Sequence, residues 1–201
     1  MPSSDEGLVQ IPEESMRRDP PELHRLMGSW FSSPSLLSHA FSQALPTPHV
    51  VIDHFFSEPF ARSLAHDFPS SSDEGWHVYD NPLERKRASS RIAAFPPTLR
   101  QAVLALCCPR IVEAMRVVTG LSKEEGLQAD RYCHGGGLHS HSRGGKLDLH
   151  LDYSRHPISG LERRYNLIVY LTEEWRTEYG GALELCERTP SLSTHDLSSL
   201  N

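Results

Sequence analysis

The stretch KLDLHLDYSRH, residues 146–156, combines the alternation of a β-strand with chemically active side chains. Apolar and polar residues alternate in it, which predicts a strand over 146–153. Side chains at positions i and i+2 of a strand point to the same side of the sheet. His150 and Asp152 therefore share one face, and their side chains can converge on one cation. Asp148 lies on the same face at the start of the strand, and the pattern gives it no further role.

The composition bounds the class of protein. The 201 residues are enough for one domain with a sizeable core. A formal net charge of -6 argues against a nucleic-acid-binding protein. No stretch approaches a membrane span, which needs about 20 apolar residues, and the first ten residues lack the features of a signal peptide. Four cysteines without regular spacing do not form a disulfide framework. We expect an intracellular, cytoplasmic protein that binds neither nucleic acid nor membrane.

The chain divides into three parts by composition. Residues 1–45 are rich in Ser, Pro and charged residues, which predicts a poorly ordered N-terminal arm. Residues 46–186 contain the apolar periodicities and form the predicted folded domain. Residues 187–201 are rich in Ser and Thr with little apolar alternation, which predicts a disordered tail.

Local signals predict three helices in the first half of the folded domain. Ser57 is suited to an N-cap, with Pro59 in the first turn. Thr98 and Gln101 fit a capping box that opens a second helix. A third apolar repeat at helical spacing stops at Gly120, a residue suited to the position just after a helix.

The period of the apolar residues changes to two in the second half, which predicts further strands at 164–171 and 182–186. A short β-branched run at 49–53 predicts an earlier strand, and residues 70–95 resemble an irregular connection. Helices followed by antiparallel strands favour an α+β fold containing a small barrel or jelly roll.

Four motifs follow one another along the chain: His150 to Asp152, Tyr170-Leu171-Thr172, Glu174-Trp175 and GGALEL at 180–185. Their order resembles the prolyl 4-hydroxylase-like branch of the 2-oxoglutarate/Fe(II)-dependent dioxygenases. That family has H-x-D, then a Y-L-N strand, then an acidic-Trp turn, then G-G-x-L-x-L. The resemblance covers about residues 46–186, and the combined order is more specific than any single motif.

The resemblance implies a double-stranded β-helix (a jelly roll) with packed helices. It implies a reaction in which decarboxylation of 2-oxoglutarate is coupled to hydroxylation of a C–H bond. His150 and Asp152 would be two of the three Fe(II) ligands of a two-histidine, one-carboxylate site, with no catalytic residue beyond the metal ligands. Tyr170 would reach the cosubstrate or, in the alternative, complete the core. The implied cofactors are Fe(II) and 2-oxoglutarate, with ascorbate as reductant. The implied substrate is a protein, with a prolyl residue first, or a small molecule.

The third ligand is the open question. The family places a second histidine some tens of residues after G-G-x-L-x-L, followed by an Arg or Lys that pairs with the distal carboxylate of 2-oxoglutarate. The sequence stops before that distance, and His195 lies in a stretch without a strand pattern. We expect the third ligand and the last strands to be missing and His195 not to bind the metal. The chain would then be a truncated dioxygenase-like domain, active or catalytically inactive.

A zinc-binding module is the remaining alternative. Cys133, His134, His139 and His141 carry thiolate and imidazole groups that zinc accepts. Their spacing matches no standard zinc finger. We expect these side chains to decorate a Gly-rich loop instead.

Overall fold

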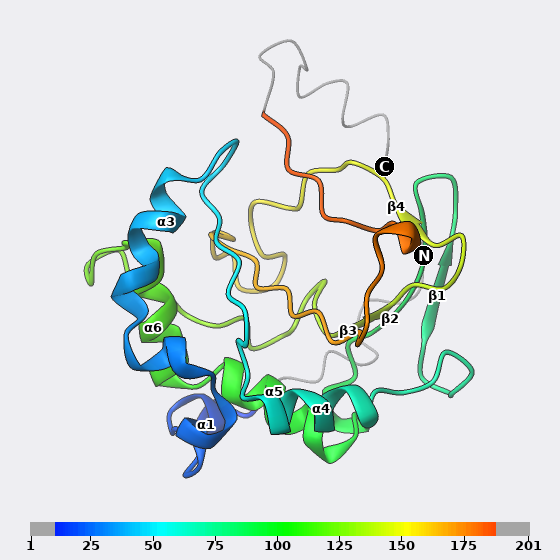
Figure 1. Ribbon diagram of the computed structural model, residues 1–201. Helices are drawn as coiled ribbons and strands as arrows, with labels where there is room; N and C mark the ends of the chain where they lie inside the picture. Colours follow the sequence, from blue (N-terminus) through cyan, green and yellow to red (C-terminus); the bar gives the residue numbers. More distant parts are fainter. Residues whose placement is uncertain (1–10, 188–201) are drawn as a thin grey trace.

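The computed structural model describes residues 11–187 (Figure 1). Helices dominate the first 120 residues, and short strands form an antiparallel sheet, so the architecture is α+β as predicted. No helix within residues 11–187 has the length and apolar character needed to cross a membrane. The α-helices are α1 (Glu13–Met16), α2 (Leu23–Leu26), α3 (Ser38–Gln43), α4 (Glu58–His66), α5 (Pro97–Leu106) and α6 (Pro109–Thr119). The 3-10 helices are η1 (Ser29–Ser32), η2 (Pro34–Leu37), η3 (Ile92–Ala94) and η4 (Thr177–Tyr179). The strands are β1 (His77–Asp80), β2 (Glu84–Ser89), β3 (Leu138–Ser140) and β4 (Lys146–Leu147).

The three predicted helices form, because their signals are local. Helix α4 begins after Ser57, with Pro59 in the first turn, but the Ser57 hydroxyl donates to the carbonyl of Arg25 at 2.7 Å and does not cap the helix. Helix α6 ends at Gly120, whose φ of 72° is left-handed and costs a glycine little. The capping box predicted for α5 is wrong, because the Thr98 hydroxyl donates to the Asp67 carboxylate of the neighbouring helix end instead.

The hydrophobic core lies among the helices. Leu23 of α2, Leu64 of α4, and Ile111 and Val118 of α6 are almost completely buried. Burying one aliphatic side chain of this size contributes about 1.5–3 kcal/mol. The core therefore joins elements that are far apart in the sequence.

Residues 11–45 belong to this core, so the prediction of a poorly ordered arm is wrong for them. Ile11 is only 1% exposed, and its backbone N–H donates to the carbonyl of Arg131 at 2.8 Å. Helix α3 packs beside α6 (Figure 1) and buries Phe41. The composition misled the prediction because five apolar residues of this segment are enough to anchor it: Ile11, Leu23, Leu26, Met27 and Phe41 are buried. Residues 1–10 lie outside the described part of the chain.

Within residues 11–187 the strands form one four-stranded sheet, in which β2 pairs with β1, β3 and β4. The β1–β2 hairpin occupies a stretch predicted to be irregular, and that prediction is wrong. Gly137 leads into β3 with a φ of 107°. A Cβ atom at this position would lie 2.2 Å from the carbonyl oxygen of Ser89, so the close approach of β3 to β2 requires glycine.

The predicted strands of the second half are largely absent. Of 146–153 only β4 pairs, and neither 164–171, 182–186 nor the earlier run 49–53 forms a strand. Residues 148–187 contain no strand and are the yellow-to-orange chain that runs through the middle and upper part of Figure 1. A period of two describes a strand's faces but supplies no neighbouring strand to complete its hydrogen bonds. A double-stranded β-helix is therefore not confirmed.

Candidate metal centre

His150 and Asp152 lie together, although the segment that carries them is not a strand. His150 Nε2 is 3.5 Å from Asp152 Oδ1, and the two side chains are about half exposed, at 49% and 41%. His150 Nδ1 lies 2.8 Å from the carbonyl oxygen of Asp148. A carbonyl only accepts, so the imidazole proton lies on Nδ1 when the ring is neutral. Asp148 thus contributes its backbone rather than its carboxylate.

This arrangement leaves two lone pairs facing each other. With the proton on Nδ1, His150 Nε2 presents a lone pair toward the Asp152 carboxylate. Such a pair of acceptors is stable when a proton or a cation lies between them. Metal-binding histidines commonly donate their second ring N–H to a backbone carbonyl, as His150 does. The two groups are therefore of kinds that bind divalent cations.

The second oxygen of Asp152 is held by its neighbours. Asn166 Nδ2 donates to Asp152 Oδ2 at 2.6 Å, and a guanidinium nitrogen of Arg163 lies 3.2 Å from the same atom. Arg163 Nε also donates to Asn166 Oδ1 at 2.7 Å. Asp152 Oδ1 is left for a monodentate contact. Partners of this kind orient a ligating carboxylate. No sequence signal pointed to Arg163 and Asn166, which lie just before and within the predicted strand 164–171.

A third ligand is not found beside this pair. Within residues 11–187 no group of three or more His, Cys, Asp or Glu side chains could hold a metal ion. His195, which was expected not to bind the metal, lies outside the described residues.

Tyr170 lies in a different surrounding. It is 71% exposed and lines a pocket of about 320 Å³ beside Trp175 and Leu183. The rest of the lining is Thr172, Gly181 and Ala182, so the pocket is mainly apolar. Tyr170 does not complete the core, which removes that alternative for it.

The four residues of the zinc alternative are not brought together as a metal-binding group in the described chain. Cys133 is packed against the core, and burial raises the pKa of its thiol to about 11. His134 packs its ring on Tyr153 and His156. Partial burial, and then the Lys86 ammonium, lower the pKa values of the other two histidines, His139 and His141.

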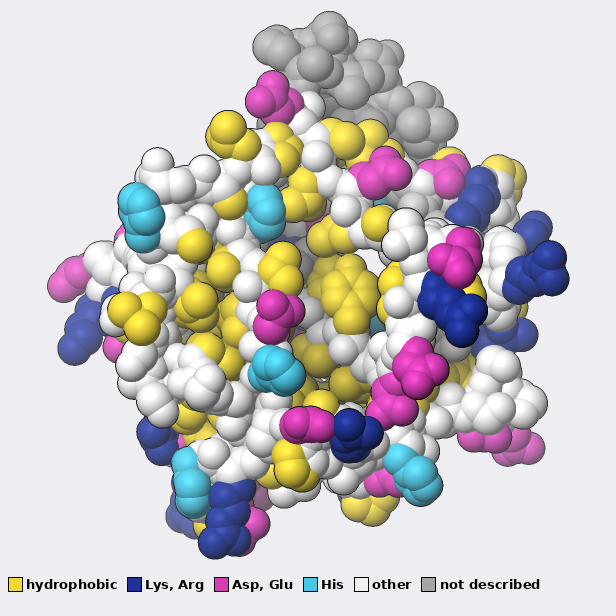
Figure 2. Space-filling view, viewed as in Figure 1, with side chains coloured by type: hydrophobic (Ala, Val, Ile, Leu, Met, Phe, Trp, Pro, Cys, Tyr) yellow, Lys and Arg dark blue, Asp and Glu magenta, His cyan; other side chains and the backbone are white. Residues whose placement is uncertain are grey.

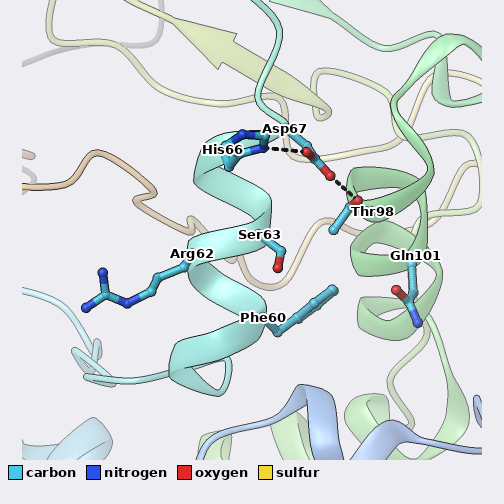
Figure 3. A pocket seen from close by; sticks show the side chains of 7 residues that line it. All are labelled: Phe60, Arg62, Ser63, His66, Asp67, Thr98 and Gln101. Atoms are coloured by element: carbon cyan, nitrogen blue, oxygen red, sulfur yellow. Dashed lines mark hydrogen bonds and ion pairs between the residues drawn. The ribbon is translucent and has the colours of Figure 1, made fainter.

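An open pocket of about 580 Å³ between α4 and α5 was not predicted (Figure 3). In it the Asp67 carboxylate lies between two partners, with His66 Nδ1 at 2.9 Å from one oxygen and the Thr98 hydroxyl donating to the other. The hydrogen bond from Thr98, and then that from His66, lower the pKa of Asp67. The imidazole does not contact the hydroxyl, so this chain of groups does not activate a nucleophile. The pocket is also lined by Phe60, Arg62, Ser63 and Gln101.

Comparison with known families gives one match. Residues 133–198 match the model of the 2OG-Fe(II) oxygenase superfamily, which is about a third of the chain and includes His150, Asp152, Tyr170 and His195. Comparisons with curated proteins and with solved structures give no match. The matched part of the chain thus supports the 2OG-Fe(II) oxygenase superfamily, and with it an oxidoreductase function of the dioxygenase type.

Proposed function

We propose that the chain is an Fe(II)/2-oxoglutarate-dependent dioxygenase that hydroxylates a C–H bond, with a prolyl residue of a protein as the first substrate to test. The observation that carries the proposal is the pair His150 and Asp152. The two residues lie inside the matched region, and the atoms that could bind a metal, His150 Nε2 and Asp152 Oδ1, are 3.5 Å apart. The prolyl substrate rests on the resemblance of the motif order, which is an argument by analogy.

His150 and Asp152 are the proposed iron ligands. His150 Nε2 is available because Nδ1–H donates to the Asp148 carbonyl. Asp152 Oδ1 is available because Asn166 and Arg163 hold the other oxygen. When bound, Fe(II) would supply the reaction of O₂ with 2-oxoglutarate, and ascorbate would serve as reductant. Tyr170 is the proposed contact to the cosubstrate, from the rim of its apolar pocket.

The second candidate is a catalytically inactive domain of the same family. It is favoured by one observation, the lack of a third ligand beside His150 and Asp152 within residues 11–187. A site with two protein ligands would hold a divalent cation more weakly than one with three, because each missing ligand removes one favourable bond.

Turnover with matched variants tests the proposal. The full chain is loaded with Fe(II) and supplied with O₂, ascorbate, 2-oxoglutarate and a prolyl peptide, and succinate is quantified. We expect succinate to form, and to fall to background in His150→Ala and Asp152→Ala. The control is His141→Ala, an exposed histidine outside the pair, which should leave the rate unchanged. His195→Ala should also leave it unchanged.

The other outcomes separate the candidates. A wild-type chain that binds Fe(II) through His150 and Asp152 but forms no succinate is the inactive domain. A chain that retains zinc in both of those variants and loses it in Cys133→Ala is the zinc module. Equal succinate formation in all variants contradicts the assignment of the ligands.

A further inference from the structure

His156 is the one buried polar residue among residues 11–187, and the proposed reaction does not use it. It is 6% exposed and lies four residues after Asp152. Its ring packs on two aromatic neighbours, with centroids 5.1 Å from Tyr132 and 5.3 Å from His134. A buried titratable side chain needs partners for both ring nitrogens, because leaving a buried polar atom unpaired costs about 1–3 kcal/mol.

Nδ1 of His156 closes a turn. It accepts hydrogen bonds from the backbone N–H groups of Ile158 at 3.2 Å and Ser159 at 3.0 Å. The backbone carbonyl of His156 also accepts from the N–H of Gly160 at 2.9 Å. Two donors aimed at Nδ1 require a lone pair there, so the proton of the neutral ring lies on Nε2.

Nε2 of His156 faces a second loop. It lies 3.3 Å from Asp130 Oδ1, which is close enough for an ion pair. The N–H does not point at this oxygen well enough to form a hydrogen bond. We regard the contact as electrostatic. Asp130 is itself fixed, because its two oxygens accept the backbone N–H groups of Tyr132 at 2.8 Å and His134 at 2.7 Å. His156 thus joins the turn 156–160 to the loop 130–134.

The turn is the tip of a hairpin whose base holds Asp152. Arg155 pairs with Glu162 as an antiparallel bridge, and the N–H of Arg163 donates to the carbonyl of Ser154 at 2.9 Å. Asp152 leads into one arm, while Arg163 belongs to the other and contacts the Asp152 carboxylate at 3.2 Å. The second arm continues to Asn166, which donates to the same carboxylate oxygen.

Tyr153 anchors the first arm to the same loop. Its hydroxyl donates to the carbonyl of His134 at 2.8 Å, and the Arg163 guanidinium lies 4.5 Å from the centre of its ring. The hairpin is thus attached to loop 130–134 at its base by Tyr153 and at its tip by His156.

We propose that His156 is a positioning residue: by locking the hairpin 154–163 onto the loop 130–134, it sets where the Asp152 carboxylate stands relative to Arg163 and Asn166. It acts through the backbone and does not touch the metal. The consequence for metal binding rests on the proposed function, whereas the placement of Asp152 does not.

Three variants of the full chain test this. His156→Phe keeps a ring against Tyr132 and His134 but removes both ring nitrogens. His156→Asn restores an acceptor near the position of Nδ1 and is the conservative rescue. Ile111→Val, in the core on α6, is the control for a general loss of stability.

Two readouts separate positioning from stability. The side-chain NH₂ signals of Asn166 in the NMR spectrum of the metal-free protein report its hydrogen bond to Asp152. Titration with Mn²⁺ reports the site itself. We expect His156→Phe to move the Asn166 signals and weaken Mn²⁺ binding about tenfold, the lower end for residues that orient metal ligands. His156→Asn should return both readouts toward wild type, and Ile111→Val should change neither.

Unmoved Asn166 signals in His156→Phe would overturn the proposal, as would equal shifts in Ile111→Val. If the Asn166 signals move and are rescued by His156→Asn while the wild-type chain binds no Mn²⁺, His156 positions Asp152 and it is the proposed function that fails.

Discussion

At the scale of single residues, the thiols differ most in their surroundings. Cys107 and Cys133 are packed against the core, and burial raises their pKa values to about 12 and about 11. Cys186 is exposed. Only the thiolate is a good nucleophile, so the partly buried thiols of Cys107 and Cys133 hold a reactive fraction of about one in a thousand or less at pH 8.

Alkylation should follow this difference. With iodoacetamide at pH 8, we expect Cys186 to be modified first and Cys107 and Cys133 to be modified slowly. Raising the pH from 8 to 9 should accelerate the slow sites about tenfold, because the pH stays below their pKa values. Peptide mass spectrometry over time measures the rates, and labelling in guanidinium chloride is the control in which all sites react. Equal rates in the native chain would contradict the partial burial of Cys107 and Cys133.

Some residues of the proposed site could be predicted from the sequence, and others could not. The spacing of His150 and Asp152 on a strand predicted that the two side chains converge; they do lie together, although that strand does not form. Their partners could not be predicted, because Asn166 and Arg163 reach Asp152 only once the hairpin has turned back. His156 has no motif that marks it, since its role depends on a loop more than twenty residues earlier.

At the scale of elements, the Asp67 carboxylate links the end of α4 to the start of α5 through the Thr98 hydroxyl. The hydrogen bond from Thr98, and then that from His66, lower the pKa of Asp67 from its ordinary value of 3.8. A pKa that is lowered in the folded state contributes stability above the unfolded value. This contribution is fully present above about pH 4 and is lost as the pH falls through the folded-state value.

Thr98→Val removes the larger of the two causes. We expect the pKa of Asp67 to rise toward its ordinary value, and the loss of stability between neutral and acidic pH to become smaller than in the wild-type chain. NMR titration of the Asp67 carboxyl and urea unfolding at pH 7 and pH 3 measure the two effects. Ser63→Ala is the matched control, because Ser63 lines the same pocket but donates to the carbonyl of Pro59. A pKa of Asp67 that stays unchanged in Thr98→Val would contradict the assignment.

Helices whose ends are set by nearby residues could be predicted, whereas strands that depend on partners far along the chain could not. Helices α4 and α6 follow from a proline in the first turn or a glycine at the end. The β1–β2 hairpin was missed because it carries charge instead of apolar alternation. Its pairing places Lys86 over the ring of Tyr79 and Arg85 beside Asp80. The prediction of a strand over 164–171 was wrong for the opposite reason, since this stretch has the apolar pattern of a strand but no partner strand.

At the scale of the whole molecule, the exposed apolar surface is uneven. Thirteen of the eighteen large hydrophobic side chains that are exposed within residues 11–187 lie between Leu147 and Leu185. Figure 2 shows hydrophobic side chains lining a hollow on one face of the molecule. Soluble monomers rarely expose contiguous apolar surface beyond a few hundred Å². Exposed apolar side chains are therefore concentrated between Leu147 and Leu185 of the described chain.

Dye binding and self-association test this uneven distribution. We expect the wild-type chain to bind an apolar dye such as ANS, and to sediment increasingly as larger species when its concentration rises. The double variant Leu167→Ser/Ile168→Ser should lower dye fluorescence and shift sedimentation toward the monomer. Its matched control is Leu36→Ser/Leu45→Ser, two leucines that are more exposed, at 78% and 81%, but lie outside this region. Because exposure alone would make the control the stronger variant, an equal effect of the two would show that single exposed side chains, and not a connected surface, bind the dye.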